Sequence, residues 1–244
     1  MKVNLGNIIP ISTIDWSGRS SCVIFFNGCY FKCLYCQNYA LLDSTRLIET
    51  ENIKQQIIDA KPFISAVVIS GGEPTMQFKA LYEIAKFAKQ QNLLVGIQTN
   101  GYCPDKLQML SDHKLIDKLF VDIKADPLNN KKYSILTGDI ENAAEKLIQT
   151  LNIANIVIEA RTTIFKSIND SLEILKFLKT NKYSHTYVIQ QGIHYKFLDD
   201  NINKKDMFSY KEMVSVAKDV CLQTESKSIK IRTKKSGEEI ICVS

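Results

Sequence analysis

Long hydrophobic runs are missing from this sequence of 244 residues. No stretch approaches the roughly 18 to 20 apolar residues that a membrane-spanning helix needs. The first residues, Met1 to Asn4, do not lead into the apolar core of a secretory signal peptide. We therefore expect a cytoplasmic protein without a membrane partner.

A strong excess of one charge is missing as well. The formal net charge is +5, and the basic residues are scattered apart from short clusters at 204–205 and 230–235. Solvated surface lysines explain such clusters, so nucleic acid is not an expected partner. The sequence has no internal repeat and no low-complexity linker, and its 45% hydrophobic content can bury one sizeable core.

Apolar β-branched runs alternate with segments of helical periodicity, which is typical of βα units around a parallel sheet. The expected strands span residues 22–26, 66–70, 94–98, 118–123, 155–163 and 187–190. The expected helices span residues 51–60, 78–91, 104–113, 140–152, 170–179 and 210–222, and two short strands are expected near Ile229 and Ile240. We expect a core domain over 1–195, with the segment 196–244 packing on it as a helix and short strands.

The seven cysteines are not expected to form disulfides, because no secretory signal precedes them. Cys29, Cys33 and Cys36 form a C-x3-C-x2-C loop directly after a predicted strand. Three soft thiolates in one loop can each bind a different iron of a cubane, which leaves the fourth iron without a protein ligand. Such an open metal position is typical of catalytic sites. The remaining cysteines are scattered and are expected to be free buried thiols: Cys22, Cys103, Cys221 and Cys242.

A structural metal site is the alternative from another class of protein. A structural zinc ion normally takes four ligands, and no nearby histidine or cysteine supplies the fourth. A non-catalytic iron–sulfur or zinc protein would also leave the second motif unexplained. That motif, Ser70-Gly71-Gly72-Glu73-Pro74-Thr75, ends the next predicted strand, where two glycines allow close approach to a ligand and a carboxylate suits an ammonium group.

Polar groups also follow the later strands. Asp122 and Lys124 lie two residues apart, so both side chains point to the same side of a strand. They could form a structural salt bridge or face a ligand. Gln98-Thr99-Asn100 follows the third predicted strand, and Arg161 lies late in the fifth.

The cysteine loop, with Tyr35 just before its last cysteine, resembles the signature of the radical S-adenosylmethionine (SAM) superfamily, and Gly-Gly-Glu-Pro resembles its second motif. The resemblance implies an α/β fold, a partial (β/α)6 TIM-like barrel with a short C-terminal extension. It implies one [4Fe–4S] cluster on the three cysteines and SAM beside it. The SAM-binding residues that it implies are Tyr35, Cys36, Gln37, Gly71, Gly72, Glu73, Asp122, Ile123, Lys124, Arg161 and His194.

Three further features are similar to the branch of activating enzymes for glycyl-radical enzymes. The segment 12–19 resembles their Asp-Gly-Pro-Gly-x-Arg stretch in a variant with tryptophan, here Trp16, after the aspartate. That variant indicates activating proteins of anaerobic ribonucleotide reductases. The Asp-x-Lys at 122–124 and the stretch 125–138, ending in Leu-Thr-Gly, are also typical of the branch. Gln98 departs from it, since many activases have an acidic residue at this position.

The resemblance implies an oxidoreductase that reductively cleaves SAM to a 5′-deoxyadenosyl radical. The expected protein substrate is a glycyl-radical enzyme of the anaerobic ribonucleotide reductase type, and the expected electron donor is a flavodoxin or ferredoxin. No cysteine lies between Cys36 and Gly71, so the ferredoxin-like insert of some activases is absent. A radical SAM enzyme acting on a small molecule or a modified nucleoside shares every one of these site residues and stays an alternative.

Overall fold

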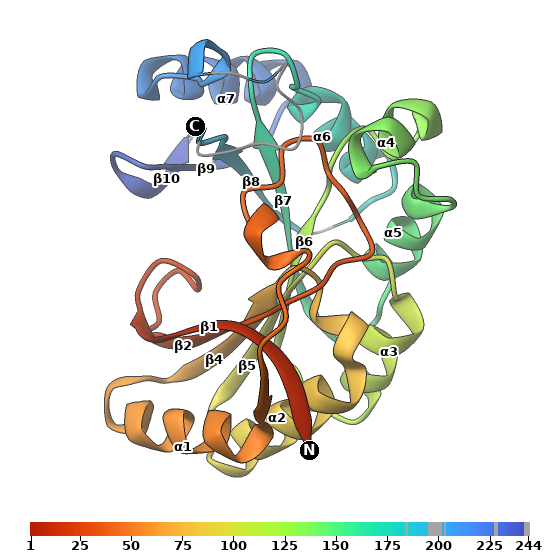
Figure 1. Ribbon diagram of the computed structural model, residues 1–244. Helices are drawn as coiled ribbons and strands as arrows, with labels where there is room; N and C mark the ends of the chain where they lie inside the picture. The colour runs from red at the N-terminus through yellow and green to blue at the C-terminus, as the bar shows by residue number, and fades with distance from the viewer. Residues whose placement is uncertain (184, 195–201, 203, 227–228, 242–244) are drawn as a thin grey trace. The chain divides into compact units, whose positions relative to one another are not determined.

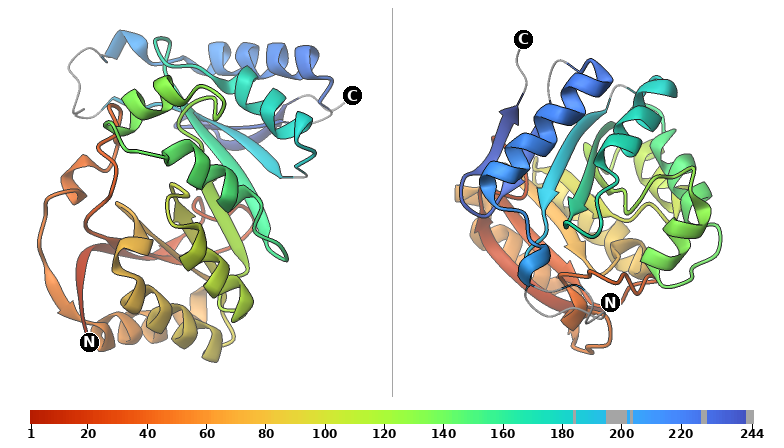
Figure 2. Two further views of the ribbon diagram at one scale, coloured as in Figure 1. Left: turned by 90° about the vertical axis from the view of Figure 1, so that its right-hand side faces the viewer. Right: turned by 90° about the horizontal axis from the view of Figure 1, so that it is seen from above.

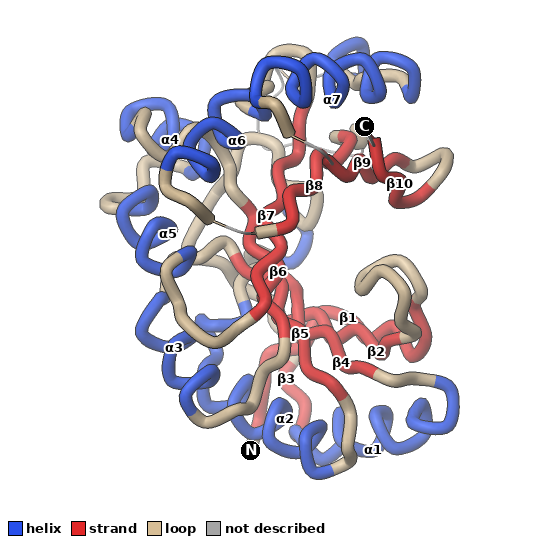
Figure 3. Tube along the Cα trace, turned by 180° about the vertical axis from the view of Figure 1, so that it is seen from behind, coloured by secondary structure: helices blue, strands red, loops and turns tan. Residues whose placement is uncertain are grey.

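The computed structural model describes residues 1–183, 185–194, 202, 204–226 and 229–241. Contacts within the chain define two compact units. The first unit comprises residues 1–30, 38–120 and 152–157, and the second comprises 31–37, 121–151 and the described part of 158–244. Figure 1 labels their helices and their strands other than β3, which Figure 3 labels.

The first unit contains five neighbouring strands of the sheet, in the order β5-β4-β2-β1-β3. Strands β2, β4 and β5 are parallel, while β1 runs antiparallel to both of its neighbours. Almost every residue of β2 and β4 is buried, as expected for parallel strands covered on both faces. The strands are β1 (Lys2–Ser12), β2 (Ser21–Phe26), β3 (Leu47–Glu49), β4 (Ala66–Gly71) and β5 (Leu94–Thr99).

The helices of this unit follow the strands in alternation and pack beside them (Figure 3). In α1, Ile53, Ile57 and Ala60 are buried at helical spacing, which gives one apolar face. This helix packs against α2 and β1, and α2 packs against β5. The helices are α1 (Thr50–Ala60), α2 (Phe78–Gln90) and α3 (Pro104–Asp112), with 3-10 turns at Tyr39–Leu41, Lys61–Phe63 and Pro74–Gln77.

The second unit contains β7 to β10 as consecutive neighbours, of which β7, β8 and β9 are parallel and β10 closes an antiparallel hairpin. Strand β6 (Lys118–Asp122) carries the chain from the first unit into this one. The other strands are β7 (Val157–Ile164), β8 (Thr186–Gln191), β9 (Ile229–Thr233) and β10 (Gly237–Ile241). The helices are α4 (Asn130–Thr137), α5 (Ala143–Leu151), α6 (Ser171–Thr180) and α7 (Tyr210–Thr224), with a 3-10 turn at Lys204–Asp206.

The last helix of the second unit has a strong start signal. Ser209 and Glu212 form a capping box, in which each side chain accepts a hydrogen bond from the backbone amide of the other. Helix α7 lies beside α6 and packs on β9 and β10 (Figure 2). The C-terminal helix and strand pair expected from the sequence are therefore present.

The predicted fold class is confirmed. Each expected strand and helix is found within a few residues of its predicted range. Within the described residues, β3 pairs only with β1 and β10 only with β9, so the strands do not close into a ring, as in a partial barrel. The proposed boundary between 1–195 and 196–244 falls on residues outside the described ranges and stays a prediction.

Strands β1 and β3, helix α4 and the 3-10 turns were not predicted. Strand β1 contains Gly6 and Pro10, which normally punctuate strands. Pro10 lies in the irregular stretch between Ile9 and Ser12, where regular pairing with β2 is interrupted, so its missing amide breaks no ladder. Helix α4 is capped by Asn129, whose side chain accepts from the Lys132 amide. None of the helices in the described part of the chain is long and apolar enough to cross a membrane.

Candidate functional site

Two glycines, the last residue of β4 and the residue after it, pack directly against the end of β2 and the loop that follows it. Gly71 has a φ of +129°, and a Cβ there would lie 2.0 Å from the carbonyl oxygen of Phe26. A Cβ on Gly72 would lie 2.1 Å from the carbonyl oxygen of Gly28. The Gly72 amide donates to Phe26 and the Glu73 amide to Gly28, both at 2.9 Å. Only glycine permits this approach, which fixes the start of the cysteine loop.

Glu73 is fully buried and joins this loop to the end of β5. Its Oε1 accepts from the amide and hydroxyl of Thr75, at 3.0 and 2.7 Å. The Thr99 hydroxyl lies 3.0 Å from both carboxylate oxygens, and the Asn100 amide donates to Oε2 at 2.8 Å. Burial raises the pKa of Glu73, and these hydrogen bonds oppose the rise. The carboxylate is therefore already surrounded by donors from the protein.

Asn100 reaches the first cysteine of the loop. Its Nδ2 donates to the Sγ atom of Cys29 at 3.7 Å, and its Oδ1 accepts from the Tyr102 amide at 3.0 Å. Asn100 is buried, whereas Cys29 is half-buried. Both residues belong to the first unit.

In the second unit, the backbone of residues 136–138 holds the rest of the cysteine loop. The Lys32 amide donates to the Thr137 carbonyl at 3.0 Å, and the Leu34 amide donates to the Leu136 carbonyl at 3.3 Å. Gly138 has a φ of +83°, and a Cβ there would lie 2.9 Å from the Cβ of Lys32. The Leu-Thr-Gly stretch thus supports the part of the loop between Phe31 and Cys36.

Tyr35 is anchored to the end of β6. It is buried, and its hydroxyl donates to the Lys124 carbonyl at 3.0 Å. Lys124 Nζ lies 3.0 Å from Asp122 Oδ2, so the two side chains form an ion pair. Burial raises the pKa of the Cys33 thiol to about 11, although Lys124 opposes the rise. Cys36 is half-buried, and its amide donates to the Cys33 carbonyl at 3.1 Å.

Arg161 is engaged with a carboxylate of its own strand. Its Nε donates to Glu159 Oε1 at 2.8 Å, and both side chains are buried. Arg232 lies 3.6 Å from the same oxygen and 2.6 Å from Glu238 Oε2. Burial, followed by the charge of Arg232, lowers the pKa of Arg161. The Ile123 amide donates to the Arg161 carbonyl at 2.8 Å, which joins the end of β6 to β7.

Gln98, which departs from the acidic residue noted in the sequence analysis, forms hydrogen bonds through both polar atoms of its side chain. Its Oε1 accepts from the Ser70 hydroxyl at 2.6 Å, and its Nε2 donates to Asp15 at 3.3 Å. Gln98 therefore links the segment 12–19 to the ends of β4 and β5. Trp16 of that segment is buried and meets Phe120 edge to face, with ring centroids 5.5 Å apart.

The other two predicted SAM-binding residues are less enclosed. Gln37 is exposed. His194 is half-buried at the end of a described range, and its backbone amide donates to Met207 Sδ at 3.4 Å.

The predicted site residues fall into two groups, one in each unit. Those in the first unit are Cys29, Gly71, Gly72 and Glu73, and those in the second are Cys33, Tyr35, Cys36, Gln37, Asp122, Ile123, Lys124, Arg161 and His194. Sequence reasoning did not assign Thr75, Thr99 or Asn100 to the site. Thr75 lies in the glycine motif, Thr99 ends β5 and Asn100 follows it, and these positions were the available signal.

The expectation of free thiols outside the loop is correct for Cys22, which is buried, and for Cys103, which is only half-buried. It is wrong for Cys221, which is disulfide-bonded. Cys242 lies outside the described residues. The expectation that the cysteines form no disulfide is therefore wrong for Cys221.

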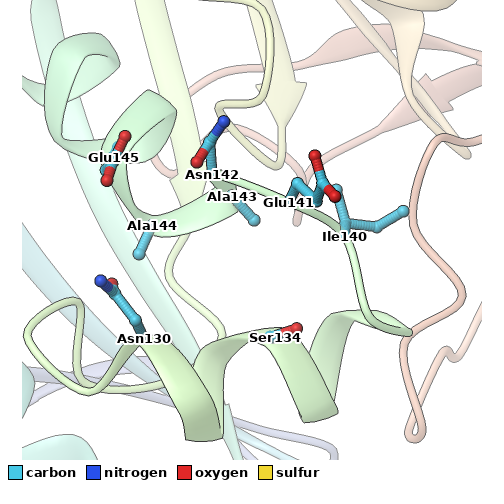
Figure 4. Close-up of a pocket in the computed structure, with 8 residues that line it drawn as sticks. All are labelled: Asn130, Ser134, Ile140, Glu141, Asn142, Ala143, Ala144 and Glu145. Atoms are coloured by element: carbon cyan, nitrogen blue, oxygen red, sulfur yellow. The ribbon is translucent and has the colours of Figure 1, made fainter.

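A pocket of about 290 Å³ lies between α4 and the start of α5 in the second unit, and none of the predicted site residues lines it (Figure 4). Its lining is both polar and apolar and comes from Asn130, Ser134, Ile140, Glu141, Asn142, Ala143, Ala144 and Glu145.

Comparison with known proteins places this chain in a family. The Radical SAM superfamily matches residues 23–178. A protein of Methanocaldococcus jannaschii, whose description as a glycyl-radical enzyme activating enzyme is provisional, is 34% identical over 89% of this chain and 92% of its own length. The pyruvate formate-lyase-activating enzyme of Staphylococcus epidermidis is 24% identical over 87% of this chain and 83% of its own length.

The fold is also found among solved structures. SuiB of Streptococcus suis aligns with a TM-score of 0.66 at 18% identity, over 85% of this chain and 47% of that one. The chain belongs to the radical SAM superfamily of enzymes, and this membership implies an iron–sulfur cluster and SAM as its cofactors.

Proposed function

We propose that Cys29, Cys33 and Cys36 hold one [4Fe–4S] cluster and that SAM binds beside it. The observation that carries this proposal is that all three cysteines lie inside the segment that matches the superfamily, and none of them is in a disulfide bond. Three thiolate ligands suit a cubane with one open iron. Deprotonation of the buried Cys33 thiol would accompany metal binding, because the thiolate is the ligand.

The chemistry of the donors suits a cluster. In the ranges that the structure describes, no three histidine, cysteine or acidic side chains gather around a point that could hold a single metal ion. A cubane does not require three side chains to meet at one point, since each cysteine binds a different iron. Cys29 already accepts a hydrogen bond from an amide, as cluster thiolates do.

For SAM, we propose contacts from both groups of residues. The tight loop of Gly71 and Gly72 would meet the methionine amino group, with the buried Glu73 shaping the loop. Asp122, Ile123 and Lys124 at the end of β6 would meet SAM from the second unit. The other residues proposed to contact it are Tyr35, Cys36, Gln37, Arg161 and His194.

When bound, the reduced cluster and SAM together supply a 5′-deoxyadenosyl radical. The chain itself binds, orients and shields these groups. Tyr35 is held by its hydrogen bond to the Lys124 carbonyl and by packing against Phe165, with ring centroids 6.0 Å apart. The ion pair of Lys124 with Asp122 fixes a charged side chain at the same strand end.

We propose that the radical takes a hydrogen atom from a glycine Cα of a partner enzyme. The two relatives described above carry names that include activation of a glycyl-radical enzyme and of pyruvate formate-lyase. The segment with Trp16 supports a partner of the anaerobic ribonucleotide reductase type. A flavodoxin or ferredoxin is the proposed electron donor.

The test uses protein purified without oxygen and loaded with iron and sulfide. With dithionite, SAM and a candidate anaerobic reductase, we expect 5′-deoxyadenosine and a glycyl-radical doublet in the EPR spectrum. Cys33→Ser should abolish both products. Cys103→Ser changes a free thiol outside the loop and is the matched control, with both products retained.

Two results would contradict parts of the proposal. Bound zinc without 5′-deoxyadenosine formation would rule out the cluster and SAM cleavage. Production of 5′-deoxyadenosine without the doublet, in the presence of a competent reductase, would leave SAM cleavage standing and remove the glycyl-radical partner. The protein would then act on a small molecule or a modified nucleoside.

A further inference from the structure

Asn100 is oriented by its two hydrogen bonds. The side-chain oxygen accepts from the Tyr102 amide at 3.0 Å, so it faces a backbone donor. The side-chain nitrogen then faces Cys29 Sγ at 3.7 Å. The reversed amide would set its NH2 group against a backbone N–H and its oxygen against the sulfur, which removes both hydrogen bonds. Asn100 therefore presents a donor to this cysteine.

A buried carboxylate holds the backbone of Asn100 in place. Glu73 Oε2 accepts from the Asn100 amide at 2.8 Å, and Thr99 is bound to the same carboxylate. Glu73 is fully buried and Asn100 is 6% exposed, so water hardly competes for these hydrogen bonds. The glycine loop, the end of β5 and the first cysteine are thereby connected through three side chains.

An N–H···S hydrogen bond to a cluster thiolate acts differently on the two oxidation states. The reduced cluster carries one more electron, and its ligand sulfurs carry more negative charge. A donor therefore stabilises the reduced form more than the oxidised form, which raises the reduction potential.

We propose that Asn100 is a positioning residue that holds the Cys29 thiolate and raises the reduction potential of the cluster, with Glu73 anchoring it. This inference rests on the proposed function, in which Cys29 is a cluster ligand. It assigns to Glu73 an action through Asn100, separate from any contact of the glycine loop with SAM.

Asn100→Ser separates the two hydrogen bonds of the side chain. Serine can still accept from the amide two residues later, so the turn to Tyr102 is kept. Its shorter side chain removes the amide donor to the sulfur without adding charge. We expect Asn100→Ser to bind iron at the wild-type level and to show a lower midpoint potential in an EPR-monitored redox titration.

Two further variants grade the effect. Asn100→Asp keeps the acceptor for Tyr102 but sets a negative charge against the sulfur, so its midpoint potential should fall further than that of Asn100→Ser. Glu73→Gln keeps the shape of the anchor but exchanges one carboxylate oxygen for a donor. The lost negative charge of Glu73 acts to raise the potential, so a potential below the wild-type value in this variant would come from the weakened support of Asn100.

Asn129→Ser is the matched control. Asn129 also accepts from a backbone amide, that of Lys132, but it caps α4 and reaches no described thiol. Its potential should equal that of the wild type. If Asn100→Ser does not fold, the neutral Asn100→Thr, which also keeps a hydroxyl acceptor, takes its place in the titration.

A wild-type potential in the folded, iron-loaded Asn100→Ser or Asn100→Thr protein would overturn this inference while leaving the cluster assignment intact. A wild-type protein that assembles no cluster would instead defeat the proposed function. The two failures are therefore distinguishable, and neither measurement depends on the glycyl-radical assay.

Discussion

The hydroxyl of Tyr35 donates to the carbonyl of Lys124 across 89 positions of sequence, at 3.0 Å. This contact ties the cysteine loop to the end of β6 within the second unit. Tyr35 is 3% exposed, so its hydroxyl has little access to water. The carbonyl is thus the partner that makes burial of the phenol acceptable.

Tyr35→Phe removes this hydroxyl and keeps the ring. We expect it to lower the free energy of unfolding by about 1 to 2 kcal/mol, because the carbonyl loses a buried donor. Urea denaturation followed by circular dichroism measures the loss. Tyr82→Phe is the control, since its hydroxyl bonds to His113 at an exposed position and its loss should stay below about 0.5 kcal/mol. Equal losses in the two variants would contradict the structural role of Tyr35.

Much of the fold could be predicted because hydrophobic periodicity and the residue types at strand ends are local features of the sequence. The runs that became β2 and β4 are nearly all apolar, and the three cysteines and two glycines lie at fixed spacing beside them. The contact of Asn100 with Cys29 could not be predicted, since it depends on how a loop after β5 returns to a loop after β2. Contacts between the ends of strands that are distant in sequence produce no periodic pattern of residues.

The same limit applied to Glu73. Its motif indicated a carboxylate that could meet an ammonium group, but spacing does not show which donors will surround it. Only the fold brings Thr99 and Asn100 to its two oxygens. The same applies to Arg161. Its position late in a strand was predicted, but its hydrogen bond to Glu159, two residues earlier, was not.

Gly72→Ala tests the close packing of the glycine loop. The added Cβ would lie 2.1 Å from the Gly28 carbonyl oxygen, a backbone atom that cannot rotate away. We expect a loss of more than about 3 kcal/mol in the free energy of unfolding, or no folded protein at all. Gly237→Ala is the control: its φ is +71° but nothing lies within 4 Å, so a loss of only about 1 kcal/mol is expected.

Thermal melting of both variants decides whether the loss of stability in Gly72→Ala has a steric or a purely conformational cause. A Gly72→Ala protein with the same melting temperature as Gly237→Ala would show that the loop can move away from β2. The close approach would then not be required for the fold.

Glu238 should make the second unit sensitive to acid. Its carboxylate lies 2.8 Å from Lys230 Nζ and 2.6 Å from Arg232 Nη2. Burial works to raise the pKa of Glu238, but the two cations outweigh it and lower the pKa to about 2. Because this lies below the unfolded value of about 4.3, the carboxylate stabilises the fold above that value and loses this effect as the pH falls through about 2.

Glu238→Gln should therefore flatten the dependence of stability on pH between about 5 and about 2, by an amount on the order of 1 to 3 kcal/mol. Urea denaturation at a series of pH values measures it. Lys230→Met leaves Arg232 in place and should remove only part of the dependence. An unchanged acid limb in Glu238→Gln would show that the carboxylate is not responsible.

Gly96 and Trp16 should be coupled through the core of the first unit. A Cβ on Gly96 would lie 2.8 Å from Phe120 and 2.9 Å from the Trp16 ring. We expect Gly96→Ala alone to cost about 1 to 3 kcal/mol by overpacking, and Trp16→Phe alone to cost about 1 to 2 kcal/mol by leaving space. In the double variant the smaller ring makes room for the methyl group. The loss of stability in the double variant should therefore be about 1 kcal/mol smaller than the sum of the two single losses.

A double-mutant cycle with urea denaturation measures this coupling. The control cycle replaces Trp16→Phe with Ile57→Val on α1, a residue that is not among the atoms nearest to Gly96. That pair should be additive within about 0.5 kcal/mol. Additivity in the Gly96 and Trp16 pair would mean that β5 or the segment 12–19 shifts to accept the methyl group, and that Trp16 does not fix this segment against the sheet.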